Sequence, residues 1–74
     1  MNYQAAIGVY IRQQGLMKSA VAERAGITLP RFSQILNSKT PLKMDEFLSV
    51  CNALNVKPSE FIKTLDKIRT EVKT

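Results

Sequence analysis

The sequence predicts an all-α fold, a compact domain of five helices, from three observations. Apolar residues recur at helical spacing in five segments, and no stretch alternates apolar and polar residues over more than a few positions. The chain has only three glycines and three prolines, and several of them fall between the periodic segments. With 74 residues, 45% of them hydrophobic, residues 1–74 are expected to form one domain around one small core.

The first two helices are predicted from their apolar faces and from the glycines that follow them. A helix over 3–14 places four apolar side chains on one face, Ala6, Ile7, Tyr10 and Ile11. Gly15 is expected to end it, because glycine tolerates left-handed backbone at a helix terminus. A shorter helix over 18–25 turns three residues inward, Val21, Ala22 and Ala25. Gly26 is expected to end that helix and to begin a tight turn.

The third helix is predicted over 28–37. Thr28 is a suitable N-cap, since its hydroxyl can accept a hydrogen bond from an early backbone N–H. Pro30 suits the first turn, where its missing N–H would have had no partner. The expected inner face consists of Phe32, Ile35 and Leu36, which leaves Ser33, Gln34 and Asn37 facing out. A polar loop over 37–41 follows.

The last two helices are predicted over 44–54 and 58–74. The expected inner face of the fourth comprises Met44, Phe47, Leu48, Val50, Cys51 and Leu54. Asn55 can take the left-handed position at its end. In the fifth helix, the apolar series consists of Phe61, Leu65, Ile68 and Val72. The first two are expected to close the core, whereas the last two either contact a second subunit or belong to a frayed tail.

Composition excludes several classes of function. Cys51 is the only cysteine and the chain has no histidine, so no intramolecular disulfide, zinc cage or Cys–His or Ser–His nucleophilic pair is expected. We therefore expect neither an enzyme nor a cofactor, and we expect Cys51 to be a small core residue. No apolar run approaches the roughly 18 residues of a membrane span, and the start of the chain does not resemble a secretory signal. A cytoplasmic protein without a membrane partner is the expectation.

The chain is basic, with a net charge of +5 and a pI near 9.7. This balance suggests a polyanionic partner, although a merely soluble basic domain would have the same charge. The helices over 18–25 and 28–37, joined at Gly26, indicate a helix-turn-helix motif over 17–37. A small Ala22 would allow the helices to cross closely. Apolar anchors, Ile27, Phe32 and Ile35, would leave the outer face of the second helix free for a DNA major groove.

The segments LMKSAVAERAGI at 16–27 and TLPRFSQILNSKT at 28–40 resemble the phage-repressor type of DNA-binding domain, which includes lambda repressor and Cro. The similarity continues through Pro41 and FLSVCNALNVKPSEF, and covers about residues 4–65. It implies a five-helix lambda-repressor-like domain that regulates transcription. It further implies binding to double-stranded DNA as a repressor, as a homodimer on a pseudo-palindromic operator. The chain offers no ligand domain for a small molecule.

The resemblance also implies residue roles. The helix over 28–37 would be the recognition helix, with base-reading positions Leu29, Pro30, Arg31, Ser33 and Gln34. Contacts to DNA phosphates would come from Lys18, Thr28, Asn37, Ser38, Lys39, Thr40 and Lys43. Ile68 and Val72 are the candidates for a dimer interface.

Two departures from the family pattern affect these roles. Met17 stands where the family often has Ser or Thr, which puts one helix cap and one phosphate contact in question. Leu29 and Pro30 can offer only apolar contact, such as to a thymine methyl group. Direct readout would then depend on Gln34, which suits adenine, and on Arg31, which suits guanine if it reaches inward and otherwise binds phosphate or is solvated.

Three alternatives stay open from the sequence alone. The chain could be a partner-binding protein of the same fold that has lost base reading. It could be an antitoxin or a restriction-control regulator, both of which still bind DNA. An unrecognised small hydrolase is the enzymatic alternative.

Overall fold

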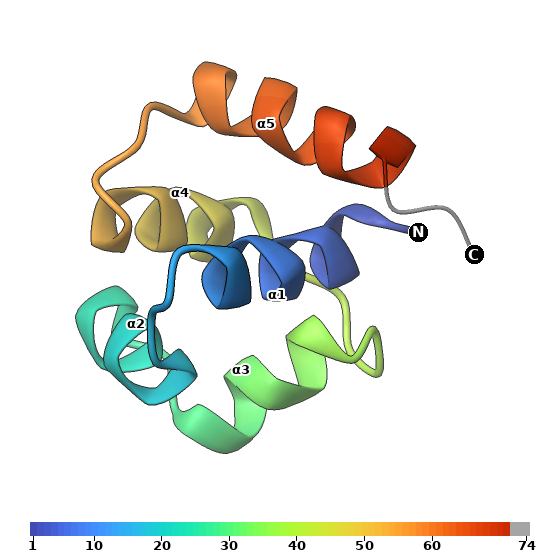
Figure 1. Ribbon diagram of the computed structural model, residues 1–74. Helices are drawn as coiled ribbons and strands as arrows, with labels where there is room; N and C mark the ends of the chain where they lie inside the picture. The colour runs from blue at the N-terminus through green and yellow to red at the C-terminus, as the bar shows by residue number, and fades with distance from the viewer. Residues whose placement is uncertain (72–74) are drawn as a thin grey trace.

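The computed structural model describes residues 1–71, which form five helices in chain order (Figure 1). The helices are α1 (Tyr3–Gln13), α2 (Lys18–Ala25), α3 (Leu29–Leu36), α4 (Met44–Ala53) and α5 (Pro58–Glu71). The predicted all-α class and the order of the helices are confirmed. Each observed boundary lies within a residue or two of the prediction, apart from the end of the fifth helix, where residues 72–74 are outside the described residues.

The helices pack around α1, which lies between α5 on one side and α3 on the other (Figure 1). α2 packs on both α3 and α4, so that α2 and α3 form one lobe of the domain. The largest fully buried side chains come from four of the five helices, and they are Phe32, Phe61, Ile7, Ile35, Leu65, Val50 and Cys51. Within residues 1–71, no helix has both the length and the apolar character needed to cross a membrane.

The predicted helix ends are confirmed where they depend on left-handed backbone. Gly15 and Gly26 adopt φ angles of 68° and 71°, and Asn55 adopts 58°. The N–H of Ile27 donates to the carbonyl of Ala22 at 3.0 Å, which closes the turn between α2 and α3. Ala22 is 1% exposed, consistent with a small side chain where the two helices approach. The helix-turn-helix geometry therefore follows from local backbone chemistry.

Two apolar residues of α4 are not on its inner face as predicted. Met44 is 71% exposed and Leu48 is 46% exposed. Successive residues are about 100° apart around a helix, so Leu48 lies well away from the direction shared by Phe47 and Val50. Met44 occupies the first turn, at the end of the helix. Cys51 is buried as predicted, and burial raises the pKa of its thiol.

The prediction that Ile68 extends beyond the core is wrong. Ile68 is 6% exposed and belongs to the core cluster, because the start of the chain packs along the end of α5. Arg69 Nε donates to the carbonyl oxygen of Met1 at 2.8 Å, and the guanidinium lies 4.3 Å from the centre of the Tyr3 ring. Tyr3 Oη donates to Asp66 Oδ1 at 2.6 Å. Ile68 is therefore covered by its own chain, and Val72 is outside the described residues.

Candidate nucleic-acid interface

The face of α3 that points away from the core carries most of the residues predicted to read bases. Phe32 and Ile35 are fully buried, and they fix the rotation of the helix against α1 and α2. On the outer face, Leu29 is 43% exposed. Pro30 and Gln34 are also exposed, and Ser33 is half-buried at the edge. The structure thus brings together Leu29, Pro30, Ser33 and Gln34 on one accessible face of an anchored helix.

Arg31 differs from the other residues predicted to read bases, because its guanidinium is held by α4. Arg31 Nε donates to Glu46 Oε2 at 2.6 Å, and Arg31 Nη2 donates to Glu46 Oε1 at 3.0 Å. This two-point hydrogen bond, with a further bond from the Lys43 N–H, lowers the pKa of Glu46 to about 2. The sequence left open whether Arg31 reaches inward toward guanine; in the structure, both side chains are half-buried and bonded to each other.

The two motif helices begin without side-chain caps. Thr28 has the extended backbone of an N-cap, but its hydroxyl makes no capping hydrogen bond, so that part of the prediction is wrong. Met17 precedes α2 in the same way and also provides no cap. By contrast, Asn2 caps α1 by accepting from the Ala5 N–H at 2.8 Å. The first N–H groups of α2 and α3 therefore lack a side-chain acceptor, and such groups favour anions.

The loop after α3 is held in place by two amides from the start of α1. Gln4 Nε2 donates to the carbonyl oxygens of Ile35 and Thr40, both at 2.7 Å. Asn2 Nδ2 donates to Ser38 Oγ at 2.8 Å, and Ser38 itself has a φ angle of 61°. These bonds bring the predicted phosphate-contact residues Asn37, Ser38, Lys39 and Thr40 into one ordered loop. Sequence reasoning missed Asn2 and Gln4, because nothing local indicates partners more than 30 residues away.

The predicted lysine contacts surround the motif at three places. Lys18 begins α2, Lys39 lies in the loop after α3, and Lys43 precedes α4; all three are exposed. Within residues 1–71 the ion pairs are Arg31–Glu46 and Arg69–Asp66, so none of these lysines is neutralised by a direct partner. Exposed cations at the borders of a protruding helix are what a helix-turn-helix domain presents to the phosphates beside a major groove.

This fold and this arrangement of charges define a helix-turn-helix DNA-binding domain. Comparison with known families identifies which kind: the sequence model of the Cro/C1-type HTH DNA-binding domain matches residues 6–67. The chain belongs to this family, which confirms the resemblance seen in the sequence. The family is a class of DNA-binding regulators and not of enzymes. No curated protein and no solved structure matches the chain in these comparisons.

Proposed function

We propose that this DNA-binding regulator is a repressor that places α3 in the major groove of a pseudo-palindromic operator. The observation that carries the proposal is the contrast between the two sides of α3. Its inner side is fixed by Phe32 and Ile35, while its outer side and the following loop offer apolar, amide and ammonium groups to solvent. A rigid helix with an open outer face is what direct readout in the major groove requires.

Base recognition on this proposal is shared by few residues. The Gln34 amide is the group suited to a bidentate contact with adenine. Leu29 and Pro30 would pack on a thymine methyl group, and Ser33 would contact an adjacent base edge. Arg31 is left out of the reading set, because the bonds from its Nε and Nη2 to Glu46 hold the guanidinium against α4.

Phosphate contacts would come from both ends of α3, from α2 and from the residue before α4. Thr28 has a hydroxyl not used in capping, and Lys18, Lys39 and Lys43 are exposed cations without ion-pair partners in the described chain. Asn37, Ser38 and Thr40 add polar groups in the ordered loop. Such contacts provide affinity and register, while the base contacts provide sequence preference.

A dimer is part of the proposal for an energetic reason. About three base contacts from a single module offset little of the entropic cost of association. When two modules bind one duplex, the second binds at a high effective concentration and loses less entropy. Half-sites would then lie about one helical turn apart. Ile68 is not part of this interface, because it is buried in its own core.

Selection of bound sequences from a random duplex pool tests the proposal. We expect enrichment of a pseudo-palindrome with half-sites about ten base pairs apart, bound by two chains in sedimentation equilibrium. A reporter gene placed behind the enriched site is expected to be repressed. Weak binding without enrichment would contradict the proposal and would favour the partner-binding alternative, in which the exposed apolar residues of α3 contact a protein.

A further inference from the structure

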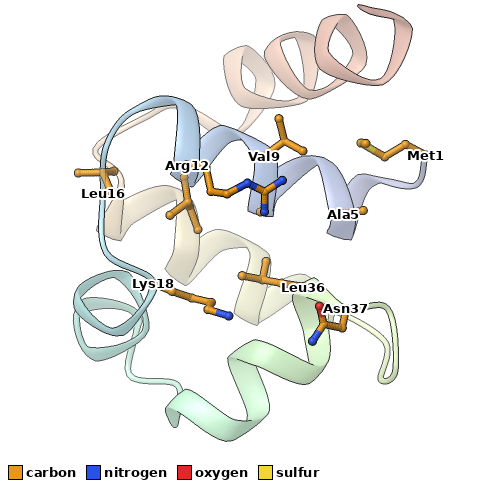
Figure 2. Close-up of a pocket in the computed structure, with 10 residues that line it drawn as sticks. Met1, Ala5, Val9, Arg12, Leu16, Lys18, Leu36 and Asn37 are labelled. Carbon is orange, nitrogen blue, oxygen red and sulfur yellow. The ribbon is translucent and has the colours of Figure 1, made fainter. Parts of the chain in front are cut away.

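A pocket of about 420 Å³ lies between α1, the start of α2 and the end of α3 (Figure 2). Its lining is apolar over much of its area, with contributions from Val9, Leu16 and Leu36. The polar groups at its edges are the guanidinium of Arg12, the ammonium of Lys18 and the amide of Asn37. No carboxylate of residues 1–71 contributes to the lining. Every hydrogen-bonding side chain of this Arg12–Lys18 pocket is therefore cationic or neutral.

The Arg12 guanidinium lies close to Gly8 and to Leu36. A Cβ atom at Gly8 would lie 3.9 Å from Arg12 Nη1 and 3.9 Å from Leu36 Cβ. The guanidinium thus lies back along α1, beside the junction with α3. In Figure 2 the Lys18 side chain extends from the start of α2 toward the same space. The pocket draws its two cations from different helices, so its formation depends on the tertiary fold.

Neither cation is neutralised by the protein. Arg12 and Lys18 form no ion pair within residues 1–71, and Arg12 makes no side-chain hydrogen bond there. Two positive charges that share one pocket repel each other unless an anion lies between them. A guanidinium and an ammonium that line the same pocket suit a phosphate group, which accepts several charge-assisted hydrogen bonds at once.

We propose that the Arg12–Lys18 pocket binds one phosphodiester of the operator backbone, with Arg12 as a phosphate-binding residue additional to those of the helix-turn-helix motif. The inference rests on the proposed function. Duplex DNA is favoured over a free anion because the pocket continues onto the outer face of α3 through Asn37, which is one turn beyond Gln34. A helix in the groove brings backbone phosphates to that border.

The first test compares two variants with the same change in charge. Arg12→Gln removes one of the two pocket cations, and Lys63→Gln removes an exposed cation of α5, a helix that packs mainly on α1 and α4. On the selected duplex we expect Arg12→Gln to weaken binding about tenfold and to flatten the salt dependence by about one unit of slope. Lys63→Gln is expected to change affinity less than about twofold. Both residues are exposed, and unchanged melting temperatures verify folding.

The second test locates the phosphate. Single phosphates of the duplex are replaced by uncharged methylphosphonate, one position at a time. Wild type is expected to lose about tenfold in affinity at one position per half-site. Arg12→Gln is expected to lose only about threefold at that same position, where Lys18 is the remaining pocket cation. Equal losses for both proteins at every position would overturn the inference.

The outcomes separate the two proposals and the two sources of phosphate. Absence of any enriched site contradicts the proposed function itself. If a site is enriched but Arg12→Gln binds it as Lys63→Gln does, only the pocket inference fails.

A third test distinguishes operator phosphate from free phosphate. Inorganic phosphate is titrated while the NMR signal of Arg12 Nε is followed. A linear response into the millimolar range supports the DNA assignment, whereas saturation below about 1 mM with unchanged DNA affinity of Arg12→Gln would assign the pocket to free phosphate.

Discussion

Two arginines lie on opposite sides of α3 and differ in whether a carboxylate is bonded to them. On the flank facing α4, Arg31 is half-buried and forms a two-point ion pair with Glu46. On the flank facing α1, Arg12 is exposed and has no ion-pair partner in the described chain. The first arginine joins α3 to α4, and the second is the one that we propose to bind a phosphate. The residue type is therefore the same for an arginine that stabilises the fold and for one that we propose to bind a ligand. What differs is whether the fold brings a carboxylate close to the guanidinium.

The largest effect on DNA binding is expected at Gln34, on the outer face of α3. Replacement of Gln34 by Ala should cost roughly 1–3 kcal/mol of binding free energy on the selected site and relax the preference at one base pair. Affinity for a panel of duplexes with each base at each position measures both quantities. If the panel shows the wild-type preference, Gln34 does not read sequence, and recognition would have to be sought on the flanks.

The next largest effect is an expected difference in thermal stability between variants of the two arginines. Arg31→Gln leaves Glu46 half-buried without its partner, so we expect the melting temperature to fall by several degrees. Arg12→Gln breaks no ion pair or side-chain hydrogen bond within residues 1–71 and should leave the melting temperature within about one degree of wild type. Scanning calorimetry at neutral pH provides the measurement. Equal shifts for the two variants would show that the ion pair adds nothing specific to stability.

The ion pair also predicts a dependence of stability on acid pH. Glu46 has a pKa of about 2 in the folded protein against an ordinary value of 4.5, so its contribution is complete above the ordinary value. The contribution is lost as the pH falls toward 2, because the unfolded chain binds the proton first. Urea unfolding of wild type and Glu46→Gln at pH 6, 4 and about 2.5 should therefore show a difference in stability that narrows toward acid. A constant difference would refute this explanation.

The smallest effect is expected at Lys39, an exposed cation of the loop that has no ion-pair partner in residues 1–71. If an unpaired charge marks a binding cation, Lys39 should behave as Arg12 does and not as Arg31 does. Lys39→Ala is expected to weaken binding to all sequences by a similar few-fold factor and to reduce the salt slope by about one unit. A change in sequence preference would indicate that Lys39 contacts a base instead.

Local sequence signals predicted much of the motif. The apolar spacing of Phe32 and Ile35 determined which side of α3 is buried, and it left Gln34 on the outer side, where the structure has it. The same logic failed for Ile68, because its spacing from Leu65 indicates burial but does not reveal what covers it. In the structure Ile68 belongs to the core cluster, and the start of the chain packs along this part of α5, where Tyr3 and Met1 bond to Asp66 and Arg69.

What the sequence by itself determined are the properties that depend on near neighbours: the five helices, the left-handed ends at Gly15 and Gly26, and the membership in a DNA-binding family. Only the tertiary structure decided which charges are used internally. Glu46 is 15 residues from Arg31, and Gln4 is 31 and 36 residues from the carbonyls that it binds. Helical periodicity reaches only three or four residues along the chain, so such pairs are settled by how the helices pack. Packing likewise leaves Arg12, which lies beside α3, without a carboxylate partner among residues 1–71.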